Sequence, residues 1–153
     1  MTRILSIRTA CSMACCCLLL ATAAVADEIG RIKVARGEVS VDRGGVAIAA
    51  APGVPVHAAD VVRTGADGSV GITMADGSLL SAGPNSLLSL DHFAFDATTQ
   101  KGRFDASLKR GTLSVVSGAI AKQSPDGMTI RTPATMLGVR GTEFVVSVDA
   151  PLP

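Results

Sequence analysis

Short runs in which apolar and polar residues alternate extend over most of the chain, from Ile29 to Val148. A period of two is typical of strands that bury one face and expose the other, whereas helical spacing is not sustained anywhere. We therefore predict about nine or ten short strands. Their apolar positions lie in residues 32–34, 39–41, 46–48, 70–74, 88–90, 104–108, 113–115, 128–130 and 144–148.

Turn-forming residues separate these runs, because glycine can adopt positive φ and aspartate can bond its own backbone. They are Gly37, Gly44-Gly45, Asp67-Gly68, Asp76-Gly77, Gly83-Pro84, Gly111 and Pro125-Asp126-Gly127. Strands and turns that recur about every 8 to 12 residues predict a single small all-β domain, built as a β-sandwich, a roll or a short β-solenoid. A βαβ arrangement is not expected, since no gap is predicted to hold a helix. The polar stretch from Asp91 to Gly102 is predicted to be a long surface loop.

Two near-identical segments, Ala66-Asp67-Gly68-Ser69 and Ala75-Asp76-Gly77-Ser78, lie nine residues apart. We interpret them as hairpin-type turns on either side of the strand at 70–74 rather than as an internal repeat. A calcium-binding repeat would need further acidic, glycine-rich copies, which the sequence lacks.

The first residues have the pattern of a Sec-type signal peptide. Arg3 and Arg8 precede an uncharged apolar run at 9–25, and Ala24-Val25-Ala26 fits a signal peptidase site. We predict cleavage after Ala26, which leaves a β domain at 27–153 in the periplasm. A retained membrane anchor is an alternative, because the run is near the lower limit of roughly 17 residues for a spanning helix. A lipoprotein is another, although Ser12-Met13-Ala14 before Cys15 is a poor lipobox.

Cysteine and charge restrict the function classes. All four cysteines, Cys11, Cys15, Cys16 and Cys17, lie in the predicted signal peptide, so no disulfide framework or thiol chemistry is expected in the domain. Without Arg3 and Arg8, twelve basic side chains remain against thirteen acidic ones, a net charge of −1. Scattered Lys and Arg without Trp or Tyr are not the pattern of a nucleic-acid binder.

The sequence carries no recognisable catalytic motif. His57 and His92 have no second ligand at metal spacing, so we expect two surface imidazoles and no zinc site. No Gly-x-Ser-x-Gly turn is present, and the acidic residues mostly lie in turns. A carboxylate pair for glycoside hydrolysis could assemble in three dimensions without any motif. We predict a non-enzymatic protein with no catalytic, cofactor-binding or metal residue.

The most distinctive stretch is residues 131–146. Pro133 is expected to end a strand, and Gly138 and Gly141 to allow a bend or bulge before the last one. Arg140 and Glu143 could pair locally, and Phe144 is expected in the core.

Together with earlier segments, this stretch resembles the FecR domain, the extracytoplasmic module of regulators of iron-dicitrate uptake, which also occurs in other bacterial envelope proteins. The resemblance covers nearly the whole domain. The matching segments are Gly37-Glu38-Val39-Ser40-Val41, Asp60-Val61-Val62-Arg63-Thr64-Gly65, Gly68-Ser69-Val70, Met74-Ala75-Asp76-Gly77-Ser78-Leu79-Leu80, Leu108-Lys109-Arg110-Gly111-Thr112-Leu113, Ile130-Arg131-Thr132-Pro133 and Val139-Arg140-Gly141-Thr142-Glu143-Phe144.

The resemblance implies a periplasmic, non-enzymatic β domain that makes protein contacts during signalling across the envelope. The family motif residues Gly138, Arg140, Gly141, Thr142 and Phe144 are expected to have structural roles. Full-length regulators of the family carry a cytoplasmic segment that binds a sigma factor. Because eight residues precede the apolar run here, no anti-sigma activity is expected.

We therefore expect a protein-interaction or sensory module whose partner is an unidentified envelope protein. This function predicts an exposed sheet edge or an apolar patch that a partner strand could extend. The alternative is a domain that binds a small ligand or a glycan, although sugar recognition usually relies on stacking aromatic side chains. An enzyme ranks third, and would need titratable groups that converge in a cleft.

Overall fold

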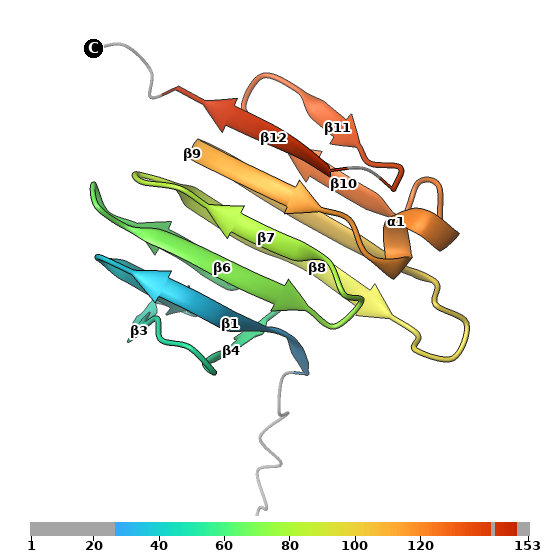
Figure 1. Cartoon of the computed structure of the whole chain (residues 1–153), viewed down its shortest axis with the longest axis horizontal. Coiled ribbons are helices and arrows are strands. Elements are labelled where there is room, and N and C mark those ends of the chain that lie inside the picture. The colour runs from blue at the N-terminus through green and yellow to red at the C-terminus, as the bar shows by residue number, and fades with distance from the viewer. Residues whose placement is uncertain (1–26, 142, 150–153) are drawn as a thin grey trace, which may run out of the picture.

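The computed structural model describes residues 27–141 and 143–149, so the predicted signal peptide lies outside the described residues. Within them the chain forms twelve strands and one short helix (Figure 1). The strands are β1 (Glu28–Arg36), β2 (Val39–Arg43), β3 (Val46–Ala49), β4 (Pro55–His57), β5 (Val61–Thr64), β6 (Ser69–Met74), β7 (Leu79–Ala82), β8 (Leu87–Phe95), β9 (Gly102–Val116), β10 (Met128–Arg131), β11 (Met136–Gly138) and β12 (Glu143–Val148). The helix is α1 (Ala119–Gln123). The prediction of an all-β domain is confirmed.

The strands form one curled sheet whose two halves share β9. The front half has the order β4-β1-β6-β7-β9-β12, and the back half has the order β3-β2-β5-β8-β9-β10-β11. In Figure 1 the front half faces the viewer, and β8 and β10 pass behind it. The arrangement is therefore of the sandwich or roll kind among the architectures that the sequence allowed.

Alternation along the strands places the core between the two halves. In β6, Val70, Ile72 and Met74 are buried, whereas the residues between them face outwards. The same pattern in the other strands buries a continuous set of apolar side chains. The largest of these are Phe104, Ile32, Leu80, Leu88, Leu90, Leu108, Leu113, Ile120, Met128 and Ile130. Each such side chain stabilises the fold by about 1.5 to 3 kcal/mol relative to exposure.

The predicted loop from Asp91 to Gly102 is wrong for about half of its length. Strand β8 continues to Phe95, and only the residues between it and Gly102 form a turn. Phe93 lies opposite Phe104 in the ladder, with ring centroids 5.5 Å apart in an edge-to-face contact. A shift of register between Ser89 and His92 interrupts the alternation of apolar and polar residues, so the sequence pattern does not predict this part of β8. Cross-strand pairing with β9 stabilises it as a strand.

Asp96 begins the turn that remains between β8 and β9. Its carboxylate accepts hydrogen bonds from the backbone N–H groups of Thr98 and Thr99, at 2.8 and 3.2 Å. These bonds stabilise the charged form, and the pKa of Asp96 is therefore lowered below its ordinary value.

Helix α1 corrects the expectation that no gap holds a helix, and β10 that follows it runs parallel to β9. Asp76, in the turn between β6 and β7, caps the first turn of α1. Its carboxylate accepts a hydrogen bond from Ile120 N at 3.3 Å, and its backbone oxygen accepts one from Ala119 N at 2.9 Å. Ser78 holds the same carboxylate through its backbone N and its hydroxyl. Five residues are too few for helical periodicity to show in a sequence. Strands β4, β5, β7 and β11 have only three or four residues and were not predicted individually.

Gly111 is the corner at which β9 passes from the back half to the front half. Its φ is +88°, and a Cβ atom there would lie 2.2 Å from the Ser86 hydroxyl oxygen. That oxygen accepts a hydrogen bond from Thr112 N at 3.0 Å and lies 3.2 Å from the carbonyl oxygen of Thr112, to which it donates. The glycine of the segment at 108–113 is thus required by the fold.

Candidate interaction surfaces

The family motif residues lie along the connection between β11 and β12 and do not form a cavity together. Gly138 is exposed at the end of β11, and Gly141 has φ +58°, as a glycine-dependent bend requires. Arg140 is exposed beside Gly141 in a shallow hollow of about 280 Å³. Phe144 is half-buried and packs against the core, while Thr142 lies outside the described residues. Arg140 is not ion-paired with Glu143 in the described structure, whose ion pairs lie elsewhere.

Asp60 belongs to another segment that resembles the family. Its carboxylate is buried, and both of its oxygen atoms accept hydrogen bonds. Its side chain is 1% exposed and accepts hydrogen bonds from Arg43 Nε at 2.9 Å and Arg43 Nη2 at 2.8 Å. The backbone N of His57 donates a further bond at 2.9 Å. The hydrogen bond and the charge of Asp60 raise the pKa of Arg43. This cluster joins the ends of β2 and β4 to the start of β5, which is a structural role.

The two histidines differ in exposure. His92 is exposed, as predicted, but His57 is not a surface imidazole: its side chain is 14% exposed, and its Nδ1 lies 3.9 Å from the Asp60 carboxylate. Burial follows because β4 pairs with the start of β1, a contact between distant parts of the sequence. Within residues 27–141 and 143–149, no three His, Cys, Asp or Glu side chains are grouped closely enough to hold a metal ion. No helix in this part of the chain is long and apolar enough to cross a membrane.

The outward side of the front half, here called the front face, is mostly uncharged. Cross-strand pairs place its side chains in rows, one of which joins Val34, Gly71, Ser81, Ser114 and Val145. Four large aliphatic side chains are exposed on it, Val34, Leu79, Val116 and Val145, the last at 65%. The outward side of the back half carries the ion pairs Arg63–Asp42 and Arg103–Asp105, whereas the front face carries an ion pair only at its β1 border, between Arg31 and Glu28, among the described residues. The front face is therefore the better candidate for a partner.

A trough runs along β6 on the front face, because the outward residues of β6 are small. Ser69, Gly71 and Thr73 form its floor. The walls of this β6 trough are Lys33, Val34 and Arg36 from β1, and Leu79 and Ser81 from β7. Three hollows of about 550, 180 and 300 Å³ follow one another along it. Neighbouring hollows share lining residues, so the trough is continuous.

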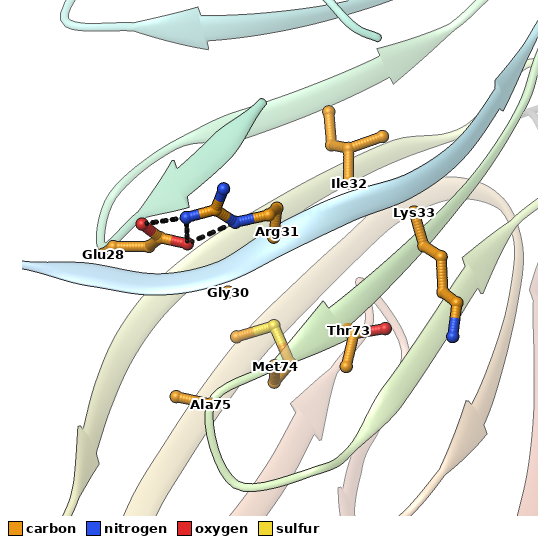
Figure 2. Close-up of a pocket in the computed structure, with 8 residues that line it drawn as sticks. All are labelled: Glu28, Gly30, Arg31, Ile32, Lys33, Thr73, Met74 and Ala75. Carbon is orange, nitrogen blue, oxygen red and sulfur yellow. Dashed lines mark hydrogen bonds and ion pairs between the residues drawn. The ribbon is translucent and has the colours of Figure 1, made fainter. Parts of the chain in front are cut away.

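The wall on β1 is basic. Arg31 is paired with Glu28 through two hydrogen bonds of 2.8 Å, which Figure 2 shows among the residues that line the 550 Å³ hollow. Lys33 and Arg36 are exposed, and neither forms an ion pair in the part of the chain that the structure describes. Lys33 occupies the position at which the β1–β6 register shifts, so it is the extra residue of a β-bulge.

Strand β12 forms the outer edge of the front half, and among the described residues it pairs only with β9. Its inward residues are Phe144, Val146 and Val148, and its outward residues are Glu143, Val145 and Ser147. Beside it a hollow of about 560 Å³ opens towards the loop between β10 and β11. The hollow is lined by Lys109, residues 132–135 and residues 146–149. We call the strand and this hollow together the β12 edge.

Sequence reasoning anticipated an exposed edge or an apolar patch, but it did not single out Lys33, Arg36 or Thr73. The alternation in Ser69–Met74 contained a usable signal, since its polar positions hold Ser, Gly and Thr only. The strands that flank these small residues could not be deduced from the sequence. Strand β7 directly follows β6, but β1 is separated from β6 by β2 to β5, so its pairing with β6 is not a local feature.

Comparison with known proteins identifies one family. The family model described as FecR protein matches residues 60–151, which is more than half of the chain and includes β5 to β12. The matched stretch thus contains the floor of the β6 trough and the β12 edge, but not β1. No curated protein matches the chain, and no solved structure does.

Proposed function

The chain belongs to the FecR family, and from this premise we propose that it is a non-enzymatic interaction module of the bacterial cell envelope, which binds a partner protein through the β12 edge. Envelope signalling is the setting that family membership favours. In this proposal the partner is an envelope protein that presents an extended segment, and the segment joins the front half as an additional strand.

The observation that carries the proposal is that no strand of the described residues pairs with the outer side of β12. A six-residue edge strand offers a row of backbone N–H and C=O groups to an incoming strand. Proteins usually protect such edges with lysine, proline or a bulge. Strand β12 has none of these, because Glu143 is its only charged residue and its register with β9 is regular.

The adjoining hollow supplies a means of selecting the partner. Side chains of an added strand alternate between its two faces, so every second one would point inwards, towards the space beside Val146 and Val148. Pro133, Ala134 and Lys109 also line that space. Small or medium-sized apolar side chains fit this lining best.

A protein partner fits these surfaces better than a glycan. Among the described residues, Phe93, Phe95 and Phe104 belong to the back half, and Phe144 faces inwards. The β12 edge therefore offers no aromatic ring on which a sugar could stack. The buried carboxylates are likewise used within the fold, as Asp60 and Asp76 are.

Site-specific photocrosslinking tests the proposal. The chain is expressed in its native host with benzoylphenylalanine in place of Val145 or, as a matched control, in place of Val46. Both are exposed valines on edge strands, at 65% and 64%, but Val46 lies on β3, at the edge of the back half. We expect one defined envelope protein to be crosslinked from position 145 only, with the crosslink in an extended segment of that protein.

The Val145→Lys variant provides the second measurement, with Val46→Lys as its control. Lysine on the exposed side of an edge strand opposes strand addition without affecting the core. Recovery of the partner should fall with Val145→Lys and persist with Val46→Lys. Equal crosslinking from both positions, or retention of glycan alone by the folded chain, would contradict the proposal.

A further inference from the structure

We propose that the β6 trough is a separate recognition site for an extended acidic peptide segment, in which carboxylates bind Lys33 and Arg36. This site does not depend on strand addition at the β12 edge, because β9 lies between the β7 wall of the trough and β12.

The shape of the trough fits one extended chain. Its floor is three outward positions of a single strand, Ser69, Gly71 and Thr73, which span about 13 Å at roughly 3.3 Å per residue. Gly71 is central, and the nearest atom to a Cβ built there is Val34 Cβ at 3.8 Å, so the floor is open at its middle. Val34 and Leu79 provide aliphatic walls on opposite sides.

The charge of the trough selects an anion. Arg31 is already paired with Glu28, whereas Lys33 and Arg36 have no carboxylate partner among the described residues. Lys33 lines the two hollows nearest Thr73, and Arg36 lines the hollow nearest Ser69. The two cations therefore stand at different points along the same wall and suit two acidic side chains of one segment.

Thr73 provides an independent observation. Its hydroxyl oxygen is buried and has no hydrogen-bond partner among the described residues. Figure 2 shows this oxygen turned towards the side on which Lys33 lies. Buried hydroxyl groups are normally hydrogen-bonded, and those that are not call for an explanation. Because the oxygen is buried in the free chain, binding must first uncover it, and a carboxylate held by the Lys33 ammonium group would then accept a hydrogen bond from this hydroxyl.

A peptide is favoured over an acidic polysaccharide by the walls of the trough. Aliphatic side chains such as Val34 and Leu79 pack against the aliphatic parts of a peptide. The described front face presents no aromatic ring, so it lacks the usual platform for sugar rings.

The experiment titrates the chain, purified from the periplasm of an expressing bacterium, with three probes. They are the peptide (Glu-Thr)₅, its neutral counterpart (Gln-Thr)₅ and oligogalacturonate as an acidic sugar. Calorimetry measures affinity, and NMR identifies the backbone amides that respond. We expect (Glu-Thr)₅ alone to bind and to shift the amide signals of Ser69, Gly71 and Thr73.

Variants then locate the contacts. Lys33→Gln and Arg36→Gln should each weaken binding of (Glu-Thr)₅ about 2- to 5-fold, as expected for solvent-exposed ion pairs. Thr73→Val, which keeps the shape of the side chain, should weaken it by a similar factor. Lys101→Gln is the control, because Lys101 is an exposed cation in the turn between β8 and β9.

Four results would overturn the assignment. They are no binding of (Glu-Thr)₅, equal binding of (Gln-Thr)₅, stronger binding of oligogalacturonate through Lys33 and Arg36, and equal weakening by Lys101→Gln. The Val145→Lys variant separates the two sites. If it abolished peptide binding, the peptide would belong to the β12 edge rather than to the trough.

Discussion

Replacing Gly111 with alanine tests whether the corner of β9 holds the two halves of the sheet together. Alanine at φ +88° incurs about 1 to 2 kcal/mol of backbone strain. The new Cβ would also lie 2.4 Å from the Cα atom of Ser86, a backbone atom that cannot turn aside. Overpacking of this kind costs about 1 to 3 kcal/mol.

The clash would also displace the Ser86 hydroxyl from Thr112, which loses hydrogen bonds worth about 1 kcal/mol. Together these terms predict that Gly111→Ala lowers the free energy of unfolding by about 3 to 6 kcal/mol. A domain of this size has about 5 to 15 kcal/mol in total, so the loss is a large part of its stability.

Equilibrium unfolding in urea, followed by far-ultraviolet circular dichroism, measures the loss. With a slope of about 1.5 kcal/mol per molar urea, the midpoint should fall by about 2 to 4 M. Gly77→Ala is the matched control, because Gly77 has φ +82° but no atom within 4 Å of the new Cβ. It should lose only the strain of about 1 to 2 kcal/mol. If both variants lost equal stability, the packing of Ser86 against the corner would not matter and the argument would fail.

Four further outcomes follow from single contacts. Phe104→Ala should cost about 3 to 5 kcal/mol and Phe144→Ala clearly less, because Phe104 is fully buried and Phe144 only half-buried; equal losses in thermal unfolding would contradict this ranking. Asp76→Ala should cost about 1.5 to 3 kcal/mol and speed amide exchange in α1, since the capping carboxylate is lost; unchanged exchange would disprove the capping role. Gly141→Val should destabilise through its φ of +58° alone, whereas a variant of native stability would show that the bend tolerates a side chain. Folding lowers the pKa of Asp96, so its carboxylate should stabilise the turn fully at pH values above its unfolded pKa of about 3.9. This stabilisation should be lost as the pH falls through the lower pKa of the folded state. Asp96→Asn should remove that pH dependence from the NMR signals of the turn.

Local patterns in the sequence were sufficient to predict most of the strands and the fold class. In β6 and β12 the alternation of apolar and polar residues determines which face is buried, whatever the partner strand is. Glycine at positions such as 37, 77 and 141 marked turns correctly, because positive φ is a local requirement. The family resemblance was likewise visible as an ordered set of short segments, and the family model confirms it.

Contacts between distant segments decided what local patterns could not. The second part of β8 is polar and irregular in sequence, yet it is a strand because Phe93 pairs with Phe104. Helix α1 exists in a gap that shows no helical period, because Asp76 from a distant turn caps it. Both features depend on partners far away in the chain, so no window of sequence contains their cause.

The candidate sites depend on tertiary structure even more strongly. Lys33, Thr73 and Leu79 come from three strands, and only the β1–β6–β7 register makes them the sides of one trough. The sequence by itself determined which residues of each strand face outwards, since alternation is local. Only the pairing of strands decided which outward residues are neighbours and which edge remains open. Pairing must satisfy the backbone hydrogen bonds of all strands together, so it depends on the whole chain and not on any one segment.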